Sequence, residues 1–111
     1  MLFEKVSETV GFLKGKTTYR PKVAVILGSG LGDLVDYIEE QVEVDYKDIP
    51  NFPVSTVAGH AGKLVFGKIG GVEVVAMKGR FHFYEGYDMK TVTYPVFVFK
   101  QFGIEKILVS N

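Results

Sequence analysis

Two short apolar segments constrain the fold of this chain more than any other feature. Residues 22–28 and 106–110 are rich in Val, Ile and Leu, and each follows a segment with helical character. Strands that are apolar along nearly their whole length are typical of parallel sheets, because helices cover both faces of such sheets. We therefore predict an α/β fold in which helices flank a mixed, largely parallel sheet.

The two flanking helices are predicted from different signals. Apolar residues recur at helical spacing in residues 2–14, which predicts an amphipathic helix that ends near Gly15. Residues 90–102 are ambiguous, because their Thr, Val, Tyr and Phe favour a strand and Pro95 disfavours a helix interior. The length of this segment and the stop signal at Gly103 favour a helix. We expect that helix to be hydrophobic on most sides and therefore buried.

A glycine pair marks the clearest turn in the chain. Gly70 and Gly71 separate two segments of high strand propensity, residues 63–68 and 72–78. This arrangement predicts a β-hairpin. The segments before it are predicted to be a short helix at 33–40, a strand at 42–46 and a loop at 47–57.

Composition excludes several classes of protein. The chain has 111 residues, of which 47% are hydrophobic, and a formal net charge of zero, so we expect one domain with its own core. A zero net charge gives no electrostatic reason to expect nucleic acid or a membrane surface as a partner. There is no Cys, and the two His have no third ligand close by, so we expect neither a disulfide nor a metal site. Without an apolar span or a secretory signal, a cytoplasmic location is expected.

The segment K-G-R-F-H-F-Y-E-G-Y at residues 78–87 carries the strongest functional signal. Arg80 offers a fixed fork of donors that suits an oxyanion. Side chains of an extended chain repeat every second position, so His82 and Tyr84 are expected on the same side as Arg80. We predict a site for an anionic ligand that carries hydroxyl groups. The alternative is that these are ordinary rim residues.

A second signal is the glycine loop G-S-G-L-G at residues 28–32, which directly follows the first apolar strand. A strand that runs into glycines and then a helix presents backbone N–H groups to an anion, and Ser29 adds a hydroxyl donor. The loop lacks the Lys of a phosphate-loop NTPase. Asp33 stands where the dinucleotide fingerprint requires its last Gly. Together with Arg80, the loop indicates phosphate.

A third signal is His60 within A-G-H-A-G at residues 58–62, where small neighbours let backbone approach closely. The alternative is a turn His that leads into a strand. Ligands of open α/β sheets gather at the carboxyl ends of strands. Ser29, Arg80 and Asn111 each follow a predicted strand, so we expect the three signals to converge.

Three motifs and the end of the chain carry a resemblance to one family. They are V-A-V-I-L-G-S-G-L-G, A-G-H-A-G-K-L-V-F-G and K-G-R-F-H-F-Y-E-G-Y, followed by I-L-V-S-N. In this order and spacing they resemble the amino-terminal part of the trimeric purine nucleoside phosphorylases, from near residue 23 to residue 111. The resemblance implies a pentosyltransferase that converts a purine nucleoside and phosphate into free base and ribose 1-phosphate. It implies a homotrimer that takes inorganic phosphate as co-substrate and needs no cofactor.

The resemblance also implies roles for single residues. Phosphate would be bound by Ser29, His60, Arg80 and His82, and a ribose hydroxyl by Tyr84. Catalysis would depend on positioning and electrostatics, without a covalent protein nucleophile, and no catalytic residue is assigned.

Two alternatives stay open at this point. A methylthioadenosine phosphorylase shares the G-R-x-H motif, but that family lacks the F-Y-E-G-Y continuation present at residues 83–87. An inactive fragment that binds phosphate or forms oligomers is the other alternative. We expect residues 1–111 to be the amino-terminal part of a single domain, truncated at its carboxyl end and inactive alone. The resemblance assigns base recognition to residues beyond it, so the preference for 6-oxo or 6-amino purines stays open.

Overall fold

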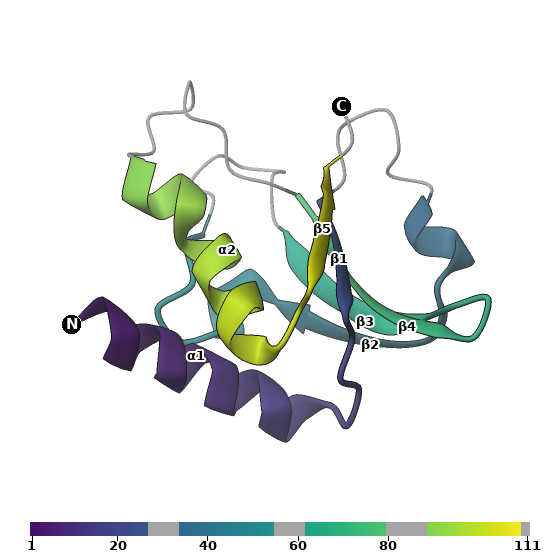
Figure 1. Ribbon diagram of the computed structural model, residues 1–111, viewed down its shortest axis with the longest axis horizontal. Coiled ribbons are helices and arrows are strands. Elements are labelled where there is room, and N and C mark those ends of the chain that lie inside the picture. Colours follow the sequence, from purple (N-terminus) through teal and green to yellow (C-terminus); the bar gives the residue numbers. More distant parts are fainter. Residues whose placement is uncertain (27–33, 55–61, 80–88, 110–111) are drawn as a thin grey trace.

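The fold is seen in a computed structural model of the chain, which describes residues 1–26, 34–54, 62–79 and 89–109. These residues form a sheet of five strands in the order β2-β3-β4-β1-β5, with two α-helices packed against it (Figure 1). The predicted α/β class, with a mixed sheet and flanking helices, is confirmed. The elements are α1 (Leu2–Lys16), β1 (Val23–Ile26), β2 (Glu39–Asp45), the 3₁₀ helix η2 (Tyr46–Asp48), β3 (Lys63–Ile69), β4 (Val72–Lys78), α2 (Met89–Phe102) and β5 (Lys106–Val109).

Four of the five strands run in one direction. β1 pairs in parallel with β4 on one side and with β5 on the other. β3 pairs antiparallel with both β4 and β2, so β3 alone of these strands runs the opposite way. The carboxyl ends of β1, β2, β4 and β5 therefore lie at the same end of the sheet as the beginning of β3. We call this the carboxyl end of the sheet.

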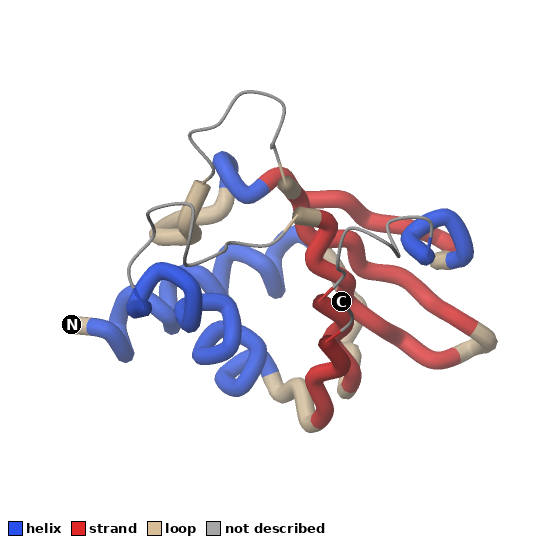
Figure 2. The backbone as a smooth tube through the Cα atoms, turned by 90° about the horizontal axis from the view of Figure 1, so that it is seen from above, coloured by secondary structure: helices blue, strands red, loops and turns tan. Residues whose placement is uncertain are grey.

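Both α-helices cover the same face of the sheet, as Figure 2 shows from above. The helices bring apolar side chains such as Leu13 and Phe99 onto alternate strand residues such as Leu64 and Phe66, and all four are buried. The intervening strand residues, including Val65, face the other way and pack under residues 34–38. Alternation along the strands thus divides the core into two layers.

The helices begin and end near their predicted bounds. α1 extends slightly past the predicted end at Gly15. α2 is a helix despite Pro95 in its interior, and it stops before Gly103, which has a φ of 109°. A left-handed glycine is a common helix terminator. The expectation of burial on most sides is wrong, because Val96 and Phe97 on α2 are each more than 40% exposed.

The hairpin prediction is confirmed. Ile69 pairs with Val72 across the turn, and Gly70 and Gly71 both have positive φ, at 57° and 83°. Two successive residues of positive φ make the turn that matches the twist of the flanking strands, and glycine adopts it without steric cost.

Two predictions on the elements need correction. Residues 34–37 form a 3₁₀ turn, but the strand β2 already begins at Glu39, so the predicted helix at 33–40 is too long. β5 was expected to be a buried parallel strand. It is parallel, but it lies at the edge of the sheet, and Leu108 and Val109 are 56% and 61% exposed. In the described part of the chain, no helix is both long and apolar enough to span a membrane.

Candidate functional site

The residues predicted to form the site, Ser29, His60, Arg80, His82 and Tyr84, lie outside the described residues. Their assignment stays a prediction. The structure does describe the elements that flank the segments containing them. Those flanking elements determine where each segment leaves the sheet and where it returns.

Two of these segments leave the sheet from neighbouring strands. Ile26, the last residue of β1, is paired with Met77 near the end of β4 and with Val109 at the end of β5. Figure 1 shows β1 and β5 side by side, ending on the same side of the molecule. Residues 27–33 and 80–88 therefore follow the ends of two neighbouring strands at the carboxyl end of the sheet, beside the end of β5.

The third segment, residues 55–61, leads into a strand at the same carboxyl end of the sheet. Lys63, the first residue of β3, is paired with Lys78, the last residue of β4. Because these two strands are antiparallel, residues 55–61 join the sheet where residues 80–88 leave it. Chain segments that are far apart in sequence thus attach at the carboxyl end of the sheet, where ligands of open α/β sheets bind.

Tyr46 forms hydrogen bonds to the residue just before β3 and to the residue just after β4, at the carboxyl end of the sheet. Its backbone N–H donates to the carbonyl of Gly62 at 3.1 Å, and its hydroxyl donates to the carbonyl of Gly79. The side chain is almost fully buried, with 2% of its surface exposed, and its ring lies 5.1 Å from the ring of Phe52. Burial raises the pKa of the Tyr46 phenol. The hydroxyl therefore stays protonated and serves as a donor.

The two glycines at the carboxyl end of the sheet are required for different reasons, Gly62 by close packing and Gly79 by its backbone conformation. A Cβ on Gly62 would lie 2.2 Å from Cε2 of Tyr46 and 2.9 Å from the carbonyl oxygen of Lys78. Gly79 has a φ of 95°, which favours glycine. The close approach at Gly62 is mainly that of the Tyr46 ring. The expectation of a close backbone approach around His60 itself lies outside the described residues.

Sequence reasoning missed Tyr46. In the sequence it is only the final residue of an alternating segment, and nothing near it marks a role. Its partner Gly79 lies 33 positions away, so only the pairing of strands brings the two together.

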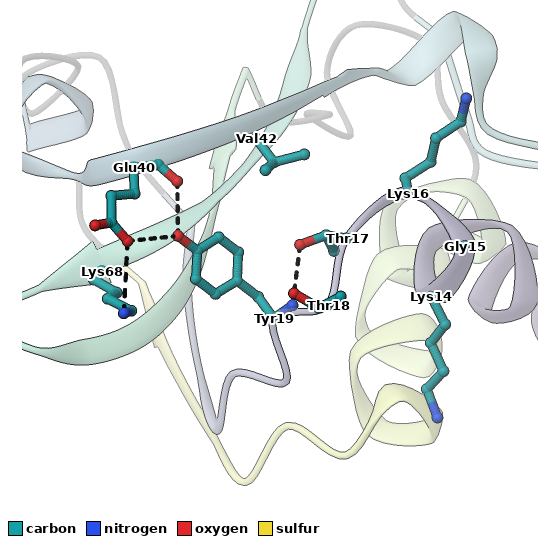
Figure 3. Close-up of a pocket in the computed structure, with 9 residues that line it drawn as sticks. All are labelled: Lys14, Gly15, Lys16, Thr17, Thr18, Tyr19, Glu40, Val42 and Lys68. Atoms are coloured by element: carbon teal, nitrogen blue, oxygen red, sulfur yellow. Dashed lines mark hydrogen bonds and ion pairs between the residues drawn. The ribbon is translucent and has the colours of Figure 1, made fainter.

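An open cavity of about 570 Å³ lies at the opposite end of the strands, between the end of α1 and the beginning of β2 (Figure 3). Three of its polar residues are paired with one another: the Tyr19 hydroxyl donates to the carbonyl of Glu40 at 2.8 Å, and Lys68 lies 3.6 Å from the Glu40 carboxylate. The cavity contains none of the residues predicted for the site. It is lined by Lys14, Gly15, Lys16, Thr17, Thr18, Tyr19, Glu40, Val42 and Lys68.

The lysines of this cavity are also engaged. Lys14 lies over the ring of Phe102, 5.6 Å from its centre, and Lys16 lies over Phe12 at 5.1 Å. Cations held over aromatic faces are partly satisfied there. We therefore locate the candidate site at the carboxyl ends of the strands and not in this cavity. Among the described residues, no group of three or more His, Cys, Asp and Glu side chains is placed to bind a metal ion.

Comparison with known proteins gives one family. The family model of the Phosphorylase superfamily matches residues 22–111. Purine nucleoside phosphorylase 1 of Bacillus subtilis is 54% identical over 108 residues, which cover 97% of this chain and 40% of that protein. The chain thus spans about 40% of the length of this curated relative.

Solved structures agree with this match. The purine nucleoside phosphorylase of Schistosoma mansoni in complex with acetate superposes with a TM-score of 0.92 at 42% identity, covering 97% of this chain and 40% of that one. The Schistosoma mansoni purine nucleoside phosphorylase in complex with inosine gives a TM-score of 0.90 at 41% identity, covering 97% and 38%. Both similarities involve nearly the whole of the present chain.

Proposed function

Because this chain belongs to the Phosphorylase superfamily, we propose that the protein carrying it is a purine nucleoside phosphorylase. The reaction is the reversible phosphorolysis of a purine ribonucleoside or deoxyribonucleoside. A phosphate oxygen forms a bond to the anomeric carbon while the bond from that carbon to the purine nitrogen breaks. The electron pair of the broken bond leaves with the purine, whose nitrogen gains, overall, the proton that hydrogen phosphate gives up. The products are free base and ribose 1-phosphate or its deoxy form.

The observation that carries this proposal is that the segments with the predicted phosphate residues all attach at the carboxyl end of the sheet. The strand ends at Ile26 and Lys78 and the beginning of β3 at Lys63 lie within one short stretch of paired strands. The segments with Ser29, His60 and Arg80 are anchored there by the covalent chain. This arrangement supports a common phosphate site for residues that are widely separated in sequence.

In the proposed site each residue has a separate role. Ser29 and nearby backbone N–H groups bind phosphate from one side, and Arg80 holds it with paired donors. His82 donates a further hydrogen bond, while His60 lies at the junction of phosphate and ribose. The developing positive charge on the sugar is stabilised by the phosphate anion itself, so catalysis depends on holding that anion close.

Further parts of the proposal concern the ribose and the whole protein. Tyr84 contacts a ribose hydroxyl. Residues 1–111 form the amino-terminal part of a single phosphorylase domain, which supplies the phosphate and ribose side of the site. The protein works as a cytoplasmic homotrimer in purine salvage. The sequence resemblance supports these statements.

Phosphorolysis of methylthioadenosine is the competing reaction, and the comparisons do not favour it. The Bacillus relative is named purine nucleoside phosphorylase, and the Schistosoma enzyme of the same name was solved with inosine. The two reactions are separated by supplying inosine and methylthioadenosine in parallel.

The test of the proposed function is the substitution Arg80→Ala in the whole protein. We expect phosphorolysis of inosine in the unaltered protein, and a rise in the KM for phosphate of at least about tenfold in the variant, because a lost charge-assisted hydrogen bond costs roughly 1.5–3 kcal/mol. Arg20→Ala is the matched control, since the Arg20 side chain donates to the carbonyls of Thr17 and Tyr19 at the far end of the sheet. An unchanged phosphate KM in Arg80→Ala would remove Arg80 from the site.

A further inference from the structure

Tyr46 forms hydrogen bonds at two junctions of the candidate site, one through its backbone and one through its side chain. Its hydroxyl donates to the Gly79 carbonyl, directly before Arg80, and its backbone N–H donates to Gly62, which follows the segment containing His60. Its ring occupies the space that a side chain at position 62 would need. One buried side chain therefore connects the point where residues 55–61 enter the sheet with the point where residues 80–88 leave it.

We infer that Tyr46 is a positioning residue for phosphate, which holds the Gly79 carbonyl and thereby the start of the segment that carries Arg80. This inference rests on the proposed function, because it assigns Tyr46 to the same phosphate site. Tyr46 does not touch phosphate in this role. It acts through the backbone at Gly79.

The packing around Tyr46 allows such a role. The ring packs against Gly62, and its centre lies 5.1 Å from that of the Phe52 ring. The side chain is almost fully buried, and a close-packed core leaves such a ring little freedom to swing. The phenol is neutral, because burial raises its pKa, and it can only be the donor toward a carbonyl.

Gly79 itself needs an external restraint. Its φ of 95° lies in a region where glycine has many accessible conformations and little steric preference. A hydrogen bond to its carbonyl selects one of those conformations. That carbonyl belongs to the peptide group that joins Gly79 to Arg80, so the hydrogen bond restrains the point from which the segment with Arg80 begins. Binding of an oxyanion by a guanidinium depends on the direction of its donors.

The experiment is the substitution Tyr46→Phe in the whole protein, which removes the hydroxyl and keeps the ring. We expect the KM for inorganic phosphate to rise about five- to tenfold, the equivalent of one net hydrogen bond. The KM for inosine should stay within about twofold of the unaltered value. Binding of inorganic phosphate is measured separately by calorimetry, as a readout that does not need turnover.

Tyr94→Phe is the matched control, since Tyr94 is also buried and its hydroxyl lies 2.9 Å from Oγ1 of Thr9. The Thr9 hydroxyl also lies within hydrogen-bond distance of the carbonyls of Lys5 and Pro50, so Tyr94→Phe removes one member of a buried hydrogen-bond group. The control loses a buried phenol hydrogen bond that involves neither Gly62 nor Gly79. Both variants should lose melting temperature, but only Tyr46→Phe should weaken phosphate binding.

The outcomes separate the inference from the proposed function. Phosphorolysis by the unaltered protein with equal phosphate affinity in Tyr46→Phe would overturn the inference alone, as would equal losses in both variants. Absence of phosphorolysis in the unaltered protein would overturn the proposed function, and calorimetry would then decide the role of Tyr46. If the unaltered protein binds no phosphate, both fail.

Discussion

At the level of single residues, the packing of Gly62 against Tyr46 has a measurable consequence for stability. Gly62→Ala would introduce a Cβ 2.2 Å from the Tyr46 ring and 2.9 Å from the Lys78 carbonyl oxygen. The ring or the backbone must shift, so we expect the free energy of unfolding to fall by about 1–3 kcal/mol. Urea denaturation of the whole protein measures this change.

The control for this substitution is Gly11→Ala. Gly11 lies inside α1, where a Cβ would meet nothing within 4 Å. Alanine in a helix interior is favoured over glycine by up to about 1 kcal/mol, so this variant should be at least as stable as the unaltered protein. Equal stability of Gly62→Ala and the unaltered protein would mean that Tyr46 is free to move.

Residue-level prediction from the sequence succeeded unevenly. The glycines at 70 and 71 could be assigned because a two-residue turn is a local structure with a local signal. The importance of Tyr46 could not, because its hydroxyl meets a carbonyl 33 positions away. The residues chosen for the site, from Ser29 to Tyr84, lie outside the described residues. Only the elements that anchor them could be compared with the prediction.

At the level of elements, the two edges of the sheet differ in chemistry. β2 forms one edge and reads E-E-Q-V-E-V-D, whereas β5 forms the other and reads K-I-L-V. Charged residues on an edge strand discourage pairing with another chain, and an apolar edge invites it. Exposure of more than half of Leu108 and Val109 therefore marks β5 as the edge that can associate.

We expect the 111-residue chain to self-associate through β5. Sedimentation velocity should show oligomers that grow with concentration, and Leu108→Lys should shift the chain toward monomer by placing a charge on the edge strand. Val72→Lys is the control, because Val72 is similarly exposed, at 55%, but lies beside the hairpin turn on β4. A monomer at all concentrations, or an equal effect of both substitutions, would contradict this prediction.

Elements with a strong local signal were predicted well. The amphipathic spacing of α1 was sufficient to place that helix. The helix α2 was placed by its length and the glycine stop, against residues that favour a strand. The burial predicted for β5 is wrong, since an apolar sequence is the same for a central strand and for an edge strand. The order of strands in the sheet decides between them, and strand order depends on long-range pairing.

At the level of the whole molecule, the chain spans about 40% of its Bacillus relative, and this limits what it can do alone. The resemblance assigns purine recognition to a part of the family that these residues do not match. We therefore expect a homogeneous preparation of the 111-residue chain to give no phosphorolysis of inosine above background. A coupled assay for released hypoxanthine makes the measurement, and turnover would show that the base pocket is built from residues within this chain.

The placement of β1 between β4 and β5 has a consequence for how the molecule is assembled. Val23 is paired with Val74 on one side and with Lys106 on the other. On a ribosome, β1 emerges before both of its partners, β4 and β5, and the second of them ends only at Val109. The β3–β4 hairpin has only a tight turn between its strands, so its contacts are local and available early. β1 must therefore wait for both of the strands that flank it, and folding through such distant pairs is slow compared with folding through local ones.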